Sequence, residues 1–319
     1  MSVDIEALKT LAQEKKLPLE RLINAIENEV AKAYAELPVA KPHGRAVLNR
    51  QSGELVIYVP VLGPDGDRID TVTDNPDGFA KLADKTARKV IKEKMREAKD
   101  LEVVTEFSGS VGDVIGGIVQ QGRDAEVIYV SLGRVEGKVP AAEQVKGEVY
   151  KHGDRIKCFV VDVKQGEKGP EVTLSRTHPA FVKMLFALEV PEIKERVVDI
   201  VGIAREPGAR TKLSVRTHRA GVSAKGALIG PQGSRAQNVM NELNGEKIDI
   251  IDFSEDPATY VANALAPAKV SSVEIVDLES KSAKVIVPDY QLSLAIGKDG
   301  QNARLAARLT QWRIDIHPD

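Results

Sequence analysis

Two short glycine pairs near the end of the 319-residue chain have the spacing of a backbone turn that can bind phosphate. With the residues between them, they are Gly230, Pro231, Gln232 and Gly233, and then Gly297, Lys298, Asp299 and Gly300. Because glycine has no β-carbon, such a turn lets peptide N–H groups and the positive N-terminus of a following helix approach an anion. Single-stranded RNA suits this site, since its phosphates meet the turn and its unpaired bases lie in the adjoining groove.

Side chains in and after the two turns are candidates for further RNA contacts. Lys298 offers a cation to phosphate, whereas Asp299 repels one unless it faces away or caps the next helix. The candidates that follow the turns are Arg235, Gln301, Asn302, Arg304 and Arg308. Because solvated helix faces commonly carry arginine, a role without RNA stays open for each of these arginines.

The glycine pairs belong to an internal repeat. Each copy ends in an Ile-Asp-Ile strand, which begins 18 residues after the first glycine in one copy and 17 in the other. Hydrophobic alternation and turn signals predict the order strand, strand, helix, glycine turn, helix, strand in both copies. The leading strands are expected at residues 197–204 and 211–216, and at residues 272–278 and 283–287. We expect Ser223 and Asp289 to cap the helices that enter the turns.

This order resembles the KH domain, whose defining feature is a Gly-x-x-Gly turn between two helices, here in the bacterial strand-first arrangement (type II). A single such turn is also an ordinary way to end a helix. Two copies with the same flanking elements favour RNA binding over that alternative. The resemblance implies two tandem KH domains, at residues 179–251 and 252–319, each holding about four unpaired nucleotides.

Residues 106–178 predict a compact β-barrel, because five short strands punctuated by glycine follow one another. The strands are expected at residues 112–121, 125–132, 136–139, 155–164 and 170–175. The segment resembles the OB-type barrel named after the largest ribosomal small-subunit protein, at residues 111–113, 132–137 and 152–156.

Barrels of this kind bind single strands by stacking bases on surface aromatics. The positions that usually carry those aromatics hold Glu126, Tyr129 and Pro140 here, so base stacking on this barrel is in doubt. Tyr129 is either a stacking platform or a core residue. The basic residues expected to add phosphate contacts are Arg134, Lys138, Arg155 and Arg176.

Residues 1–105 have the pattern of an N-terminal α/β domain. Apolar residues at helical spacing predict a helix over residues 19–37 and a long helix over residues 79–98, with a basic face opposite its apolar stripe. Strands at residues 44–49 and 55–61 and a turn at residues 63–67 lie between them. We expect the long helix to link this domain to the barrel, and its basic face is either a partner site or only solvated.

The order of these parts resembles the NusA family of bacterial transcription factors. The most specific matches are at residues 246–251, 291–298 and 301–307, and residues 174–179 match the family's junction between barrel and KH domain. The resemblance implies a non-enzymatic α+β multidomain protein that binds RNA polymerase through residues 1–105. It also implies binding to nascent single-stranded RNA, with effects on pausing, elongation, termination and antitermination, and other antitermination factors as further partners. Some members carry acidic repeats after the second KH domain, and the interactions of those repeats are not carried over to this chain.

Composition limits the function classes. A net charge of −2 gives no general attraction to polyanions, so an RNA site must come from local geometry. No basic start precedes an apolar run and no apolar stretch is long enough for a membrane span. The single cysteine, Cys158, is expected in a buried strand of a monomeric protein in the reducing cytoplasm.

Three classes of function fit parts of the pattern. Scattered histidines and the lack of phosphate-cradle and nucleophile motifs argue against a catalytic, metal or cofactor site. A ribosome-associated RNA-binding protein or RNA chaperone is the alternative to a transcription factor. A phosphorolytic ribonuclease also combines KH and barrel modules, but the chain has no room for its catalytic core.

Overall fold

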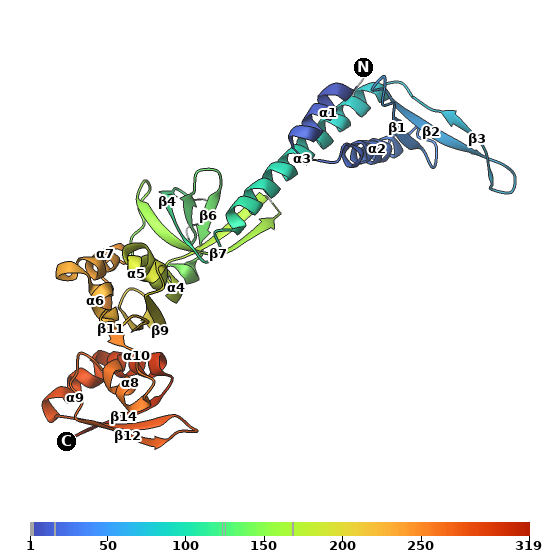
Figure 1. The fold of residues 1–319 in the computed structure, drawn as a ribbon. Helices are drawn as coiled ribbons and strands as arrows, with labels where there is room; N and C mark the ends of the chain where they lie inside the picture. The colour runs from blue at the N-terminus through green and yellow to red at the C-terminus, as the bar shows by residue number, and fades with distance from the viewer. Residues whose placement is uncertain (1–2, 16, 123, 125, 168) are drawn as a thin grey trace. The chain divides into compact units, whose positions relative to one another are not determined.

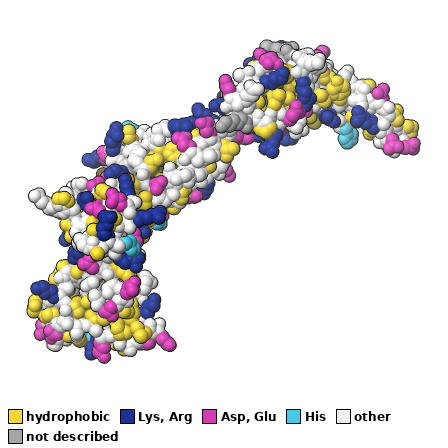
Figure 2. Space-filling model, viewed as in Figure 1, with side chains coloured by type: hydrophobic (Ala, Val, Ile, Leu, Met, Phe, Trp, Pro, Cys, Tyr) yellow, Lys and Arg dark blue, Asp and Glu magenta, His cyan; other side chains and the backbone are white. Residues whose placement is uncertain are grey.

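The computed structural model describes residues 3–15, 17–122, 124, 126–167 and 169–319 of the chain. It is an α+β fold in two compact units (Figure 1). Unit 1 consists of Met1–Glu106 and Gln165–Pro170, and unit 2 of Phe107–Lys164 and Glu171–Asp319. On the visible face of both units, Figure 2 shows lysine and arginine interspersed with aspartate and glutamate.

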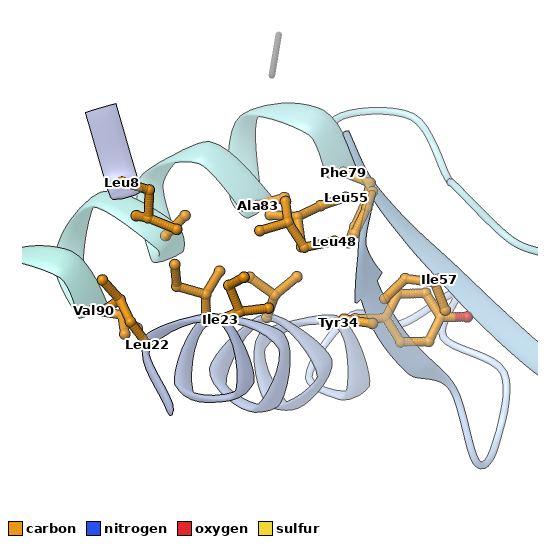
Figure 3. Close-up of a cluster of buried hydrophobic side chains, with 14 of the residues drawn as sticks. Leu8, Leu22, Ile23, Tyr34, Leu48, Leu55, Ile57, Phe79, Ala83 and Val90 are labelled. Carbon is orange, nitrogen blue, oxygen red and sulfur yellow. The ribbon is translucent and has the colours of Figure 1, made fainter. Parts of the chain in front are cut away.

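Unit 1 packs helices on one three-stranded antiparallel sheet of order β1-β2-β3. Its elements are α1 (Ile5–Glu14), α2 (Leu19–Ala35), β1 (Arg45–Leu48), β2 (Leu55–Leu62), β3 (Arg68–Thr73) and α3 (Phe79–Ser108). Figure 3 shows Ile23 and Tyr34 of α2 facing Leu48, Ile57 and Phe79. The predicted hairpin and both helices are confirmed, and β3 was not predicted.

The long helix is longer and less buried than its sequence stripe suggested. Ala83, Ala87 and Val90 are buried in the unit 1 core, as predicted. Met95 was expected on the same stripe but is 37% exposed.

The predicted five-stranded barrel is confirmed as a closed barrel of order β4-β5-β6-β8-β7. Its strands are β4 (Val114–Gln120), β5 (Ile128–Ser131), β6 (Glu136–Val139), β7 (Arg155–Gly166) and β8 (Gly169–Ser175), with a short turn of 3-10 helix, η1 (Ala141–Glu143), after β6. The predicted start of the second strand, at residue 125, lies outside the described residues. Cys158 is buried in β7 as expected, and burial raises the pKa of its thiol to about 12.

Two KH-type units follow, with the same topology. The first contains α4 (Pro179–Glu189), α5 (Pro191–Lys194), β9 (Val198–Glu206), β10 (Arg210–Thr217), α6 (Ala224–Ile229), η2 (Pro231–Gly233), α7 (Ser234–Glu242) and β11 (Lys247–Asp252). The second contains α8 (Pro257–Ala264), β12 (Ser272–Asp277), β13 (Ser282–Val287), α9 (Asp289–Ile296), η3 (Lys298–Gly300), α10 (Gln301–Thr310) and β14 (Arg313–Pro318). In each sheet an antiparallel hairpin accepts the last strand in parallel.

The predicted element order is confirmed, with one addition and one correction at the helix ends. Each unit also begins with a helix, α4 or α8, that was not predicted; both start at a proline, after His178 and Asp256 respectively. Ser223 caps α6 as predicted, its hydroxyl accepting from the N–H of Gly226 at 3.0 Å. The expected Asp289 cap is wrong, because α9 already begins at Asp289 and has no side-chain cap bond.

Unit 2 is continuous across its parts. Phe159 of the barrel belongs to the core of the first KH-type unit, and Ala204 and Ile251 of that unit belong to the core of the second. At the latter junction the Tyr260 hydroxyl donates to Ser214 Oγ at 2.9 Å. In the described part of the chain, no helix combines the length and the apolar character that a membrane crossing needs.

Candidate nucleic-acid interface

The two glycine turns have nearly the same backbone. Gly230 has φ 74° and ψ 176°, and Gly297 has φ 77° and ψ 168°. The third residue of each turn, Gln232 or Asp299, has φ near 50°, and the closing glycine is left-handed in both. The sequence repeat therefore corresponds to a repeat in three dimensions.

The first position of each turn requires glycine for two reasons: a β-carbon there would clash with the following helix, and φ is positive. A β-carbon on Gly230 would lie 2.6 Å from Cγ of Arg235, and one on Gly297 would lie 2.8 Å from the backbone nitrogen of Asn302. No heavy atom lies within 4 Å of a β-carbon built on the closing glycine, Gly300. The first glycine thus lets the turn lie flat against the helix that follows it.

Gly297→Ala is expected to destabilise unit 2 by about 1–3 kcal/mol, because φ 77° with ψ 168° is a region that glycine alone occupies readily. Gly300→Ala is the matched control. Its left-handed conformation costs roughly 1 kcal/mol and it meets open space. Urea denaturation of the two variants measures the difference, and an equal loss in both would show that the contact with Asn302 has no energetic weight.

Both turns expose their middle residues and lead into helices with open N-termini. Pro231, Gln232, Lys298 and Asp299 are exposed. Helices α7 and α10 begin directly after the closing glycines, and neither has a side-chain cap bond among the described residues. Their first N–H groups carry the positive end of the helix dipole and can accept an anion.

The residue five positions after the first glycine braces each turn. Arg235 Nη1 donates to the Ala227 carbonyl at 2.7 Å and pairs with Glu192 at 3.0 Å. Asn302 is 2% exposed, and its amide donates to the carbonyls of Ala295 and Leu265, both at 3.0 Å. Both side chains are thus occupied in holding the preceding helix, and their expected RNA contact stays a prediction.

The cations of α10 face a carboxylate from the first KH-type unit. Glu206, at the end of β9, accepts from Arg304 Nε at 2.7 Å and from Gln301 Nε2 at 2.8 Å, and Arg308 lies 3.9 Å away. These contacts, with the hydrogen bond from Arg304 the largest, lower the pKa of Glu206. Arg304 and Arg308 remain 44% and 56% exposed, so each can still meet solvent or a ligand.

Arg176, which was also expected to contact phosphate, is buried among protein partners in this structure. Its guanidinium is 2% exposed and binds both carboxylate oxygens of Glu148, at 2.6 and 2.7 Å. It also donates to the carbonyls of Lys157 at 2.7 Å and Glu242 at 3.0 Å. The side chain thus connects the barrel to α7 and is closed to an RNA phosphate in this structure.

The other barrel candidates differ in placement. Arg134 is exposed in the turn between β5 and β6, and Lys138 pairs with Glu171 at 3.2 Å. Tyr129 is half-buried against Gly122, where a β-carbon would lie 2.1 Å from its ring. This packing favours the interpretation of Tyr129 as a structural residue over a free stacking platform.

The acidic partners of these arginines could not be predicted from the sequence. Glu192, Glu206 and Glu148 lie 43, 98 and 28 positions from the arginines that they bind. No group of three or more His, Cys, Asp or Glu side chains in the described residues is arranged to hold a metal ion.

Comparison with known proteins places these elements in a family. Residues 176–253 match the model of the NusA-like first KH domain, and residues 257–319 match that of the NusA-like second KH domain. The transcription termination/antitermination protein NusA of Mycobacterium tuberculosis (strain ATCC 25618 / H37Rv) is 46% identical over 100% of this chain and 94% of its own length. NusA of Halalkalibacterium halodurans is 42% identical over 98% of this chain and 87% of its own length. NusA of Bacillus subtilis is 42% identical over 98% of this chain and 90% of its own length.

From residue 176 onward the matched models coincide with the two glycine-turn units. The relatives extend the match to the whole chain. The chain therefore belongs to the NusA family of transcription termination/antitermination factors, which are not enzymes.

Proposed function

We propose that the two glycine turns of unit 2 bind successive stretches of one nascent RNA strand while residues 1–105 bind RNA polymerase. The observation that carries the RNA part is the pair of matched, exposed turns, each leading into a helix whose N-terminus has no side-chain cap among the described residues. Such helix starts suit phosphate groups, and the flat turns admit a bulky backbone.

The packing within unit 2 supports joint action of its two turns. Lys212, fully buried on β10, donates to the Ala266 carbonyl of the second KH-type unit at 2.6 Å and to Asp249 at 2.9 Å. Two weak sites held in one body raise the effective concentration of the second site once the first is filled. Docking on polymerase would deliver this surface to the emerging transcript.

The RNA-contact set that we propose is smaller than the set expected from sequence. It comprises the backbone of Gly230, Pro231, Gln232 and Gly233, the backbone of Gly297, Lys298, Asp299 and Gly300, and the side chains of Lys298, Arg304, Arg308 and Arg134. Arg235 and Asn302 position the turns, and Gln301 binds Glu206 of the first KH-type unit. Arg176 joins the barrel to the first KH-type unit.

The proposed domain boundaries are residues 1–105, 106–178, 179–251 and 252–319. The division of the chain between residues 106 and 107 supports the first boundary. The matched KH models, which begin at residues 176 and 257, lie close to the later ones. We also propose that the protein is a cytoplasmic monomer and that other antitermination factors are additional partners.

Removal of residues 1–105 is expected to leave RNA affinity within about twofold of the full chain but to abolish co-purification with RNA polymerase. The core of unit 1 is built from residues up to Val90, so the deletion takes that core as a whole. Circular dichroism checks that the remainder is folded. A folded remainder that no longer binds RNA would place the RNA site in unit 1, and co-purification with ribosomal subunits instead of polymerase would favour the ribosome-associated alternative.

A further inference from the structure

A carboxylate of the first KH-type unit stands beside the second glycine turn. Glu206 lies at the end of β9, and both of its oxygens are used: Oε1 accepts from Arg304 Nε at 2.7 Å, and Oε2 accepts from Gln301 Nε2 at 2.8 Å. Gln301 is the first residue of α10. Arg304 also donates through Nη1 to the carbonyl of Asp299, within the turn itself, at 3.1 Å. The carboxylate is therefore held next to the helix start where we propose a phosphate.

One face of α10 is directed at this carboxylate. Gln301, Arg304 and Arg308 stand three and then four positions apart, which is the spacing of one helix face. Arg308 Nη1 lies 3.9 Å from Oε1 of Glu206, so a single carboxylate meets both cations of the helix. The Glu206 side chain is 21% exposed, whereas the two arginines are about half exposed. The cations are thus paired with the carboxylate and at the same time open to solvent.

The corresponding face of the helix after the first glycine turn is neutral. When the first glycines of the two turns are aligned, Gln237 and Asn241 of α7 take the places of Arg304 and Arg308. They form a neutral hydrogen bond, in which Nε2 of Gln237 donates to Oδ1 of Asn241 at 2.8 Å. Positive charge at the second turn is therefore supplied by the second unit and partly cancelled by Glu206 of the first.

A phosphate can displace the Glu206 carboxylate from these arginines. A partly exposed ion pair stabilises little, because solvent screens it. Phosphate offers a guanidinium the same pair of oxygens as a carboxylate does. The hydrogen bond from Arg304 is the largest cause that lowers the pKa of Glu206, so the carboxylate is charged at neutral pH. A strand that reaches α10 must therefore exchange its phosphate for this carboxylate, and the exchange costs affinity.

We propose that Glu206 competes with the RNA phosphate for Arg304 and Arg308, and thereby limits the charge-driven share of RNA binding at the second glycine turn. The proposal rests on the proposed RNA binding at the two turns. It makes the first KH-type unit a determinant of how strongly the second turn binds, and with what salt dependence. A turn limited in this way depends more on the fit of the strand in its groove and less on general attraction to polyanions.

The test measures the RNA affinity of the full chain with Glu206→Gln, which keeps the size of the side chain and an acceptor for Arg304 but removes the charge. Glu279→Gln is the matched control, because Glu279 is exposed in the β12–β13 turn and also loses one negative charge. Fluorescence anisotropy uses a single-stranded RNA of about 20 nucleotides, long enough for two KH grooves of about four each, over a range of salt concentrations. Urea denaturation checks that both variants are folded.

Glu206→Gln is expected to tighten RNA binding about 3- to 5-fold at low salt, the weight of one partly exposed ion pair. The slope of log affinity against log salt should steepen by about one phosphate contact. Glu279→Gln should change the affinity less than about 1.5-fold, because solvent and salt screen a remote charge. An unchanged affinity and salt slope in Glu206→Gln would overturn the competition. Weaker binding would also overturn it, because the carboxylate would then orient the arginines for RNA.

Arg304→Gln in two backgrounds separates competition from a general effect of charge. In the unaltered chain this change is expected to cost less than about twofold in affinity, because Glu206 already holds the arginine. In Glu206→Gln the same change is expected to cost about 3- to 5-fold, since the arginine is then free to meet phosphate. Equal losses in both backgrounds would overturn the proposal. If the unaltered chain bound no RNA, the proposed function itself would fail, which distinguishes the two failures.

Discussion

Aspartates in both glycine turns, at Pro231 and Gln232 in the first and at Lys298 in the second, are expected to lower the affinity of the full chain for single-stranded RNA by about 100-fold or more. The added carboxylates would stand at two helix N-termini that we propose as phosphate sites, and a 100-fold loss corresponds to about 2.7 kcal/mol. Aspartate tolerates the left-handed backbone of position 232, so the turn itself should persist. Fluorescence anisotropy at fixed salt measures the effect.

Lys281→Asp is the matched control for charge. This lysine is exposed in the β12–β13 turn with φ 50°, outside the two glycine turns. We expect it to change RNA affinity less than about threefold. If the turn variants kept their affinity while their thermal denaturation matched that of the unaltered chain, the glycine turns would be structural features only.

Arg176→Met is expected to have the largest effect on stability, about 3–5 kcal/mol lost from the free energy of unfolding of unit 2. The side chain of Glu148 is 5% exposed, and loss of the guanidinium would leave its charge buried without a cation. Loss of the bond to the Glu242 carbonyl would also loosen the junction with α7. Urea denaturation of the full chain measures the change.

A second variant separates lost charge pairing from lost packing. Arg176→Met combined with Glu148→Gln removes the unpaired charge, so it should recover part of the stability that the single variant loses. A double variant as unstable as the single one would assign the loss to packing against Phe181, whose ring centre lies 5.4 Å from the guanidinium.

The same pair gives the stability of unit 2 an acid dependence. Burial alone would raise the pKa of Glu148, but the hydrogen bonds and charge of Arg176 outweigh it and lower the pKa below the ordinary 4.5. The stabilisation is therefore present above about pH 4.5 and is lost as the pH falls through the lowered pKa. Arg176→Met should show a smaller loss of stability over that acid range than the unaltered chain.

Local backbone demands explain why the turns and the element order could be predicted. Gly230 and Gly297 stand where only glycine fits. In the hairpin strands apolar and polar residues alternate, and in the helices after the turns apolar residues recur at helical spacing, so both patterns can be read in the sequence. The barrel was predictable for the same reason, since glycine-punctuated strands alternate around its core. Those features are encoded within a few neighbouring residues.

The elements that were missed lack that local signal. The buried residues Phe181, Val182, Leu185 and Phe186 of α4 lie on one face of the helix. Met184 and the 51% exposed Leu188 make another side of it apolar as well, so its sequence shows little periodicity. Strand β3 has the opposite problem, because its side chains are mostly exposed and only its pairing with β2 defines it.

Side-chain roles at the interface depended on distant residues. Arg176, Arg235 and Arg304 look alike in the sequence, yet the first is buried, the second braces a turn and the third remains partly exposed. Each of the three binds a glutamate that is distant in the sequence, and the place to which the fold brings that glutamate decides the role of the arginine. Charge alone therefore could not predict which arginine is free to meet a phosphate.

The most direct test of the RNA track is a crosslinking map on a paused elongation complex that contains this protein and a transcript carrying photoreactive nucleotides. Successive nucleotides of the emerging strand are expected to crosslink within residues 230–235 and 297–308. Crosslinks confined to unit 1, or to parts of unit 2 that exclude both glycine turns, would contradict the proposal that these turns hold the nascent RNA.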